Sequence, residues 1–513
     1  MIRFEGRDIP ARQGQSLAAA LTAAGVVDLR DTRRGPEGRG LYCGMGSCQD
    51  CVMVVDGLPN RRACMTAVAP GMVVQRQPHP APIAPREAGT PPIGLDDLPE
   101  ETPELLVIGG GAGGLSAAIA ARGLGLDVLL VDERSTPGGQ YYKQPAQGHV
   151  LLDAQQSEGA ALLLAARDAG TRIMAGTEVW GAFAPLLFLA THGATHAGRT
   201  RRLRPRAAII ATGAYERAVP FPGWTLPGVM TTGAAQTLWR SHRTLPGARV
   251  LVAGNGPLNL QVALELADGG AQVVAVVEAS RGVPLVALAR MAAASPALAA
   301  KGAAMLVALR RRGIPLLRGT ALRRVTREGA LHAELSDGSR FAVDAVLCGH
   351  GFAPEDALLR AFDTEGRPAN LFAVGDATGL GGAPAAREEG HLAGLAAARL
   401  LGQAVPVDRA AQRRLARHRR FQSALWQVFA APFPGLSLAT PETMLCRCEE
   451  VTLAEVEAAL PGDLLEIKRR TRCGMGRCQG RACAPLLTTL LGVAETFTPR
   501  APARPVRISD LTA

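Results

Sequence analysis

The chain has little lysine, few aromatic residues and no long apolar run. Lysine occurs at positions 143, 301 and 468 alone, so the net charge of +11 comes almost entirely from arginine. Aromatic residues make up 4% of the chain and offer few platforms on which single-stranded nucleic acid could stack. We therefore predict no nucleic-acid partner despite the positive charge.

Segments typical of membrane and secreted proteins are also missing. No uninterrupted apolar stretch reaches the roughly 18 residues of a transmembrane helix, and no charged and apolar leader opens the chain. We expect a cytoplasmic protein without a transmembrane segment. Peripheral contact with a membrane, through a larger complex, stays open.

Catalytic groups and central cysteines are scarce as well. Cys348 is the sole cysteine between residues 65 and 445, which excludes a redox relay of two neighbouring thiols in the middle of the chain. His242, His350 and His391 are scattered, and a lone histidine is more often a packing or surface residue than a catalyst. We predict no catalytic residue on this chain.

Nine of the ten cysteines lie in two groups at opposite ends of the sequence. The first group has the plant-type ferredoxin spacing C-x4-C-x2-C-x12-C, and Gly44 and Gly46 let its loop wrap a two-iron cluster with backbone N–H groups aimed at sulfur. Strands over 1–5 and 52–55 and a helix over 16–24 suit a β-grasp domain. A structural zinc site is the alternative. The predicted 2Fe-2S ligands are Cys43, Cys48, Cys51 and Cys64.

The second group has a C-x-C pair, a gap of 24 residues, and then C-x4-C-x4-C. Residues 446–451 and 471–481 resemble the small 2Fe-2S domain of bacterioferritin-associated ferredoxin. We predict a second 2Fe-2S cluster, with zinc or free thiols as alternatives, and five thiols compete for its four ligand positions. The expected ligands are Cys446, Cys448, Cys473 and Cys478, which leaves Cys483 as the spare thiol.

A length of 513 residues with 47% apolar content suits three or four globular domains. The clearest boundary is rich in proline, because the eight prolines from Pro78 to Pro103 fit neither a helix nor a central strand. We predict a linker over residues 78–104 that follows the ferredoxin-like domain.

Residues 105–133 contain a complete βαβ dinucleotide fingerprint. A strand at 105–108 precedes a glycine-rich loop, and a helix at 115–122 and a strand at 128–131 follow it. In this fingerprint Gly109 makes the turn, Gly111 lets a pyrophosphate approach and Gly114 packs the helix on the strand. Glu133, 19 residues after Gly114, is placed to bind ribose hydroxyls.

Later segments favour FAD over NAD at this first site. A buried strand at 207–212 leads into a small-residue turn, and a buried strand at 371–374 ends in Gly-Asp. These elements resemble those of two-dinucleotide-binding-domain flavoproteins, in which the aspartate bonds the ribityl chain. The predicted FAD contacts are Gly109, Gly111, Ala112, Gly114, Glu133, Gly139, Gln140, Val179, Thr212, Gly213, Gly375 and Asp376.

A second βαβ unit repeats this pattern. Strands at 249–253 and 273–277 flank a helix at 260–266, and the spacing from Gly254 to Glu278 equals that from Gly109 to Glu133. Asn259 replaces the third glycine, which weakens the expected packing of helix on strand. Two interpretations carry equal weight: an NAD site formed by Gly254, Gly256 and Glu278, and a retained fold whose pocket no longer binds nucleotide.

The order of these parts resembles the α subunits of bacterial flavin-dependent amino acid and opine dehydrogenase complexes, such as octopine and nopaline oxidase, D-hydroxyproline dehydrogenase and hydrogen cyanide synthase. The resemblance covers essentially the whole chain and is carried by residues 137–140, 211–217, 223–229, 375–377 and 471–481. The family's ferredoxin-like γ subunit looks to be fused here at the N-terminus. The resemblance implies a hetero-oligomer in which an amine-oxidase-like β subunit oxidises the substrate at a second FAD.

We therefore predict an α/β protein with two nested Rossmann-like domains, preceded by a β-grasp ferredoxin-like domain and followed by a small helical 2Fe-2S domain. Its predicted function is transfer of electrons from the oxidation of an amino acid, imino acid or opine at a C–N bond in the partner to a quinone-like small molecule. A self-sufficient NADH-dependent flavin reductase and a zinc-bearing scaffold are the alternatives. The predicted domains are 1–77 (ferredoxin-like), 105–214 with 346–402 (FAD-binding), 215–345 (NAD-binding-like), 403–440 (helical connector), 441–492 (second 2Fe-2S domain) and 493–513 (tail).

Overall fold

The computed structural model describes residues 1–83, 94–193, 199–363, 366–494 and 496–511. Part of the predicted linker, including Pro85, Pro91 and Pro92, lies outside these residues. The chain divides into two compact units. The first comprises Met1–Pro85, Glu216–Gly351 and Ala424–Phe497, and the second comprises Arg86–Tyr215, Phe352–Ser423 and Thr498–Ala513.

The N-terminal part of the first unit is a mixed sheet in the order β2-β1-β5-β3-β4. Strand β1 pairs antiparallel with β2 and parallel with β5, which is the β-grasp arrangement. Helix α1 begins where the Ser16 side chain accepts the Ala19 N–H, an otherwise unsatisfied backbone donor. The elements are Ile2–Phe4 (β1), Arg7–Ile9 (β2), Leu17–Ala23 (α1), Val52–Val55 (β3), Leu58–Arg62 (β4) and Val73–Arg76 (β5).

The first unit also holds a parallel sheet in the order β15-β22-β16-β17-β18 and a separate antiparallel sheet β19-β20-β21. Apolar side chains of β16 and β22 are buried, as expected for parallel strands covered on both faces. The elements are Val229–Thr231 (β15), Thr232–His242 (α5), Arg249–Gly254 (β16), Pro257–Asp268 (α6), Gln272–Glu278 (β17), Leu285–Ala294 (α7), Pro296–Arg311 (α8), Leu316–Arg318 (β18), Leu322–Glu328 (β19), Ala330–Leu335 (β20), Arg340–Val343 (β21) and Ala345–Gly349 (β22).

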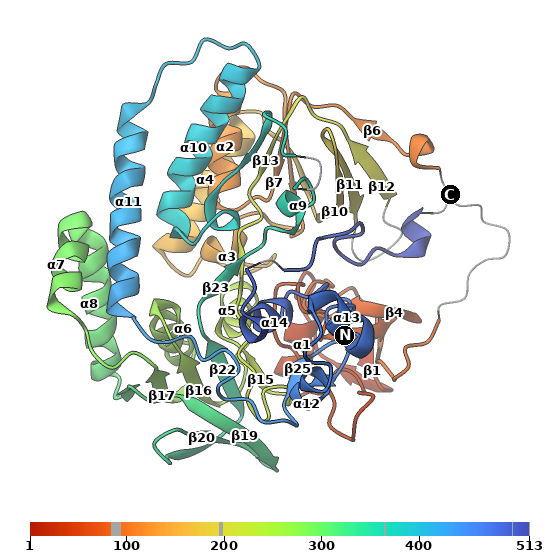
Figure 1. Ribbon diagram of the computed structural model, residues 1–513, viewed down its shortest axis with the longest axis vertical. Coiled ribbons are helices and arrows are strands. Elements are labelled where there is room, and N and C mark those ends of the chain that lie inside the picture. Colours follow the sequence, from red (N-terminus) through yellow and green to blue (C-terminus); the bar gives the residue numbers. More distant parts are fainter. Residues whose placement is uncertain (84–93, 194–198, 364–365, 495, 512–513) are drawn as a thin grey trace. The chain divides into compact units, whose positions relative to one another are not determined.

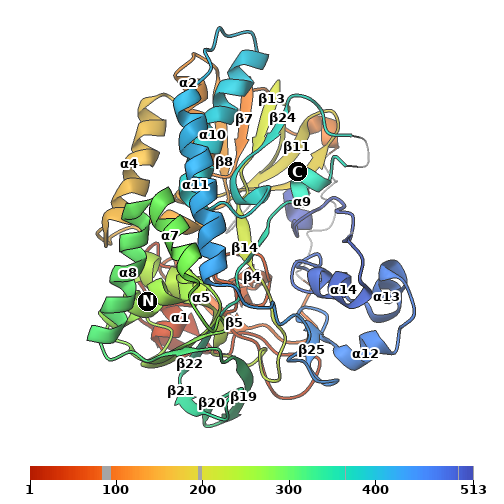
Figure 2. The same ribbon diagram turned by 60° about the vertical axis from the view of Figure 1, so that its left-hand side comes forward.

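The C-terminal part of the first unit is small and mostly helical (Figure 2). A short hairpin carries the C-x-C pair, and three helices pack around a core that contains Cys446, Cys473 and Cys483. The elements are Met444–Cys446 (β25), Val451–Thr452 (β26), Leu453–Glu457 (α12), Leu464–Thr471 (α13) and Ala484–Leu491 (α14).

The second unit is built on a parallel sheet in the order β24-β13-β7-β8-β9. Leu105 and Val107 of β7 pack under α2, α4 and α10, whereas Leu106 and Ile108 face the mixed sheet β10-β11-β12-β6. Figure 1 shows these three helices together beside β7 and β13. The elements are Leu95–Asp97 (η1), Glu100–Glu101 (β6), Leu105–Ile108 (β7), Ala112–Arg122 (α2), Val128–Asp132 (β8), Gly139–Tyr142 (α3), Ala154–Asp168 (α4), Arg172–Ala175 (β9), Thr177–Phe183 (β10), Leu187–His192 (β11), Arg199–Leu203 (β12), Ala207–Ile210 (β13), Ala357–Arg360 (α9), Leu371–Ala373 (β24), Gly375–Ala377 (η2), Gly382–Leu400 (α10) and Ile508–Leu511 (η3).

Three further elements lie where the chain changes unit. Ala214–Glu216 (β14) and Phe352–Pro354 (β23) pair with each other, and Arg409–Val428 (α11) begins in the second unit and ends in the first. No helix in the described part of the chain is long and apolar enough to cross a membrane.

The predicted fold class is confirmed, with differences of detail. Helix α6 begins at Pro257 instead of Leu260, and strand β13 ends at Ile210 instead of Thr212. Helix α2 begins at Ala112 instead of Leu115, because the last two glycines of the loop adopt helical geometry. Strand β24 is half-buried, not buried, because it lies at the edge of its sheet. The exact domain bounds stay predictions.

Candidate functional site

The first cysteine site brings its four thiols together as two pairs. Cys43 interacts with Cys48, and Cys51 interacts with Cys64. Among the described residues, these four sulfur atoms do not form one compact group of metal ligands. Two pairs suit a cluster in which each of two irons takes two thiolates, and a single zinc ion would need all four sulfurs around one point.

The loop also supplies the backbone donors expected of an iron–sulfur site. The Cys48 N–H donates to Cys43 Sγ at 3.4 Å. The Cys48 thiol, followed by the N–H groups of Met45 and Cys48, lowers the pKa of Cys43 to about 6 against the opposing effect of burial. These donors favour a thiolate, the form in which cysteine binds iron.

Gly44 has a second role that the spacing alone does not reveal. Its φ is +61°, and a Cβ there would lie 2.8 Å from Ala234 Cα on α5. The first cysteine loop, residues 43–51, therefore packs directly on the neighbouring Rossmann-like domain.

The second cysteine site gathers all five thiols. The sulfur atoms of Cys446, Cys473 and Cys483 lie within 4.8 Å of one another, and all three residues are buried. Cys448 Sγ lies 3.8 Å from Cys446 Sγ and 3.5 Å from Cys478 Sγ. Cys473 and Cys483 both lie within this distance of Cys446, so the geometry does not single out a spare thiol, and the choice of ligands stays a prediction.

A buried ion pair joins the two cysteine sites. Asp50 belongs to the first cysteine loop, and Arg447 is the middle residue of the C-x-C pair, which we call the second cysteine loop (446–448). The Asp50 carboxylate accepts from Arg447 Nε at 2.6 Å and from Arg30 Nη2 at 2.7 Å. Burial alone would raise the pKa of Asp50, but Arg447, Arg30 and Arg39 outweigh it and lower that pKa, so the carboxylate is ionised.

Aromatic rings enclose the same arginine. The Arg447 guanidinium lies 3.8 Å from the ring centre of Tyr42 and 4.6 Å from that of Trp224, and it donates to the Trp224 carbonyl at 2.6 Å. Tyr42 directly precedes Cys43. Arg447 is 3% exposed and Asp50 1%, so water does not screen this pair.

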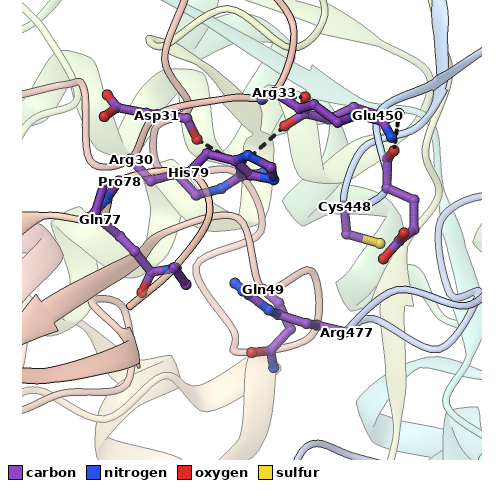
Figure 3. A pocket seen from close by; sticks show the side chains of 12 residues that line it. Arg30, Asp31, Arg33, Gln49, Gln77, Pro78, His79, Cys448, Glu450 and Arg477 are labelled. Atoms are coloured by element: carbon purple, nitrogen blue, oxygen red, sulfur yellow. Dashed lines mark hydrogen bonds and ion pairs between the residues drawn. The ribbon is translucent and has the colours of Figure 1, made fainter. Parts of the chain in front are cut away.

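A polar cavity of about 150 Å³ lies beside the pair. Its wall includes Gln49 from the first cysteine loop and Cys448 from the second, with His79 and Arg477 nearby (Figure 3). Both cysteine loops thus border one cavity.

The glycines of the first glycine-rich loop, in the second unit, differ in how much space a side chain would have. Gly109 has a φ of +106°, and a Cβ at Gly114 would overlap the Gly109 carbonyl oxygen. At Gly111, by contrast, a Cβ would meet only Gly139 Cα, at 3.8 Å. The loop leads into the N-terminus of α2, whose free N–H groups favour a phosphate. These features fit the pyrophosphate of FAD.

Two neighbouring acids at the C-terminal end of β8 have different partners. Asp132 Oδ2 accepts the Gly110 N–H at 2.6 Å, and burial raises the pKa of Asp132 to about 6. Glu133, the predicted ribose ligand, forms an ion pair with Arg504 at 3.3 Å. Arg504 also lies 3.6 Å from Glu178 and 3.5 Å from Glu355. The C-terminal segment therefore reaches the predicted FAD contacts of its own unit.

The remaining predicted FAD contacts lie on elements of the second unit. Asp376 Oδ1 accepts from the N–H groups of Gly381 and Gly382 at 2.9 and 3.0 Å, at the start of α10. Burial raises the pKa of Asp376. Other positions are Gly139 and Gln140 on α3, Val179 in β10, Thr212 and Gly213 after β13, and Gly375 in η2.

The second glycine-rich loop is covered by its own chain. A Cβ at Gly256 would lie 3.7 Å from the Trp426 ring, and Asn255 Nδ2 donates to the Phe429 carbonyl at 3.0 Å. The Glu278 carboxylate is fully buried and accepts the Gly256 N–H at 3.0 Å, which turns it toward the loop. The end of α11 therefore occupies the side from which a pyrophosphate would approach.

Asn259 keeps the helix close to the sheet, contrary to the expected weakening. Its Nδ2 donates to the Gly349 carbonyl at 2.9 Å, and its Oδ1 accepts from Thr232 Oγ1 at 2.8 Å. Hydrogen bonds here replace the close packing that a third glycine provides.

Sequence reasoning missed Asp50, Arg447, Trp426 and Arg504. Two of them lie within cysteine motifs, and that position was their only local signal. The partners of Trp426 and Arg504 are distant in sequence and no motif marks them.

Comparison with known proteins supports this arrangement. Residues 103–390 match the family model of the pyridine nucleotide-disulphide oxidoreductases, and residues 1–79 match that of the 2Fe-2S iron-sulfur cluster binding domain. An opine oxidase subunit from Agrobacterium tumefaciens is 32% identical over 80% of this chain and 91% of its own length. Hydrogen cyanide synthase subunit HcnB of Pseudomonas aeruginosa is 31% identical over 74% of this chain and 90% of its own. The crystal structure of L-proline dehydrogenase from P. horikoshii shares the fold, with a TM-score of 0.72 at 20% identity over 99% of this chain and 96% of that one.

The fold and these matches define an oxidoreductase subunit with an FAD-binding domain and a 2Fe-2S domain. The chain belongs to the pyridine nucleotide-disulphide oxidoreductase family, in the group that contains these opine oxidase and hydrogen cyanide synthase subunits.

Proposed function

We propose that this chain is the electron-transfer subunit of a heteromeric dehydrogenase. A partner subunit oxidises an amino acid, imino acid or opine at a C–N bond, and this chain carries the electrons to a quinone or a similar small molecule. The names of both relatives describe them as subunits, one of an opine oxidase and one of a hydrogen cyanide synthase. Their similarity to the chain supports a hetero-oligomer.

One observation carries this proposal. The FAD-binding domain has no redox dithiol of its own, and it belongs to a chain whose two cysteine sites lie next to each other. Within the described residues, Cys348 is the sole cysteine on a strand of either Rossmann-like sheet, and it is buried in β22. When bound, FAD supplies exchange of one or two electrons and each 2Fe-2S cluster supplies exchange of one. Electrons must therefore enter or leave through the cysteine sites, a bound acceptor or a partner.

We assign the FAD contacts to the residues named from the sequence, with two roles now sharpened. Gly111 presents the open side of the loop to the pyrophosphate, and Glu133 meets the ribose while Arg504 holds its carboxylate in place. The first cluster binds Cys43, Cys48, Cys51 and Cys64. The second binds four of the five C-terminal thiols.

The covered second loop argues against a self-sufficient NADH-dependent reductase. Trp426 and the Phe429 carbonyl lie beside Gly256 and Asn255, on the loop that the NADH pyrophosphate would approach. Anaerobic titration of the isolated chain with NADH tests this point. We expect the flavin absorbance to persist, and prompt bleaching would instead establish the reductase.

Co-purification tests the partner, and metal analysis tests the clusters. We expect an amine-oxidase-like flavoprotein, encoded by a neighbouring reading frame, to elute with this chain and to reduce its flavin when an amino acid or opine is added. Zinc without iron at the cysteines would favour the scaffold alternative.

A further inference from the structure

We propose that the Asp50–Arg447 ion pair couples the two cysteine sites, so that one electron passes directly between their clusters. Arg447 and Asp50 are positioning residues, because neither is a ligand and each acts through its neighbours. The inference rests on the proposed 2Fe-2S occupancy of both sites and adds a connection that neither motif encodes.

The pair is attached to both sites by short covalent segments. Asp50 directly precedes Cys51, and Arg447 has a cysteine on either side. One hydrogen bond of 2.6 Å, between Asp50 Oδ2 and Arg447 Nε, therefore interrupts an otherwise covalent path from the first site to the second. The Arg447–Tyr42 contact at 3.8 Å forms a second path, since Tyr42 is bonded to Cys43.

Neighbouring contacts hold the two cysteine loops next to each other. Arg30 bridges Asp50 at 2.7 Å and Glu450 at 3.4 Å, and Glu450 accepts the Arg33 N–H at 2.8 Å. Glu450 follows the second cysteine loop by two residues. The β-grasp domain and the C-terminal domain are thus joined at the cysteine loops themselves.

The burial of these charges also makes them effective. Reduction adds a negative charge to a 2Fe-2S cluster, and net charge and hydrogen bonding near the sulfur atoms set its potential. A buried cation beside both sites favours reduction, and a buried anion opposes it, with little screening by water. The transfer itself moves one electron, and no bond forms or breaks and no proton moves.

Neutralising the positive and the negative member of the pair in separate variants provides the test. In full-length chain loaded with FAD and iron, Arg447→Gln should lower the reduction potentials of both clusters. The expected shift is about 59 mV, which corresponds to a tenfold change in the one-electron reduction equilibrium. Asp50→Asn should raise both. Arg447→Lys retains the charge and should stay near wild type. The potentials are followed by redox titration with EPR detection, and iron content is measured in each variant.

Arg34→Gln is the matched control. Arg34 pairs with Glu455 across the same two domains, but both side chains are more than one-third exposed and lie outside the cysteine loops. Its potentials should equal those of wild type. If Arg447→Gln fails to fold, Asp50→Asn still tests the sign, because asparagine preserves the size of the side chain and an acceptor for Arg447.

Wild-type spectra give a second readout. Two reduced clusters on either side of one ion pair should perturb each other magnetically. The EPR spectrum of the fully reduced chain should therefore be split or broadened relative to that of the half-reduced chain. Two additive, independent signals would overturn the coupling, as would an Asp50→Asn variant that moves the first cluster alone. These results would leave the proposed function standing, since partner binding and NADH titration are measured separately.

Discussion

Gly114 and Gly111 differ in their surroundings at the scale of single residues, as their different roles in the sequence motif predict. A Cβ at Gly114 would overlap the Gly109 carbonyl oxygen, whereas one at Gly111 would meet only Gly139 Cα at 3.8 Å. Gly114→Ala should therefore destabilise the chain by about 2 kcal/mol and abolish flavin binding. Gly111→Ala should fold normally with reduced flavin content. Thermal unfolding and the flavin absorbance check both, and equal effects of the two variants would contradict the assignment.

His350 is a buried group with an expected signature in pH dependence. Both ring nitrogens lack a partner among the described residues, and burial lowers the pKa of His350 to about 4. The unfolded chain takes up this proton near pH 6.5, so stability present above that pH is lost as the pH falls toward 4. In His350→Leu the unfolding temperature should fall less than in wild type between pH of about 7.5 and about 5.5. His332→Leu, on β20, should keep the wild-type dependence.

The five C-terminal thiols exceed the needs of one cluster by one. Cys473 and Cys483 are both buried and both within 4.8 Å of Cys446. One of the variants Cys473→Ser and Cys483→Ser should therefore keep its iron, and the other should lose about half of it. The sequence prediction assigns the loss to Cys473→Ser. Cys348→Ser serves as the control with full iron. Equal losses in both variants would show that both thiols are ligands and that the spare thiol is another cysteine.

At the scale of elements, the end of α11 covers the second glycine-rich loop. Trp426 lies over Gly256, and the next turn supplies the carbonyl that Asn255 binds. Trp426→Ala should open this side of the loop and raise affinity for NAD at least about tenfold, measured by calorimetry. Gln427→Ala, an exposed neighbour on the same helix, should leave affinity unchanged. Tight binding of NAD by the wild type would contradict the closure.

At the scale of the whole molecule, the C-terminal segment returns to the FAD-binding unit. Arg504 neutralises Glu133, Glu178 and Glu355, which would otherwise repel one another. Arg504→Gln should lower the free energy of unfolding of this unit by about 3 kcal/mol, because it leaves partly buried carboxylates uncompensated. Arg367→Gln, whose ion pair with Asp363 is local and exposed, should cost less than about 1 kcal/mol. Differential scanning calorimetry compares the two variants. Equal losses of unfolding free energy would contradict the role assigned to Arg504.

Much of the fold was predictable because its signals are local. The bounds of β3 and β7 match the predicted ones, since a short apolar strand next to a turn or glycine loop is determined by neighbouring residues. The start of α2 was wrong by three residues, because packing on the sheet keeps two glycines helical where propensity would not. Candidate ligands followed from spacing for the same local reason, although which thiols bind stays a prediction.

The sequence by itself determined the two cysteine groups, the two dinucleotide folds and the missing central dithiol, because each depends on residues close together in the chain. The tertiary structure decided what those parts do to one another. It joined Asp50 to Arg447, placed Trp426 over the second loop and brought Arg504 to Glu133. Each contact links residues more than 150 positions apart, and burial, which local sequence does not encode, gives each charge or ring its effect.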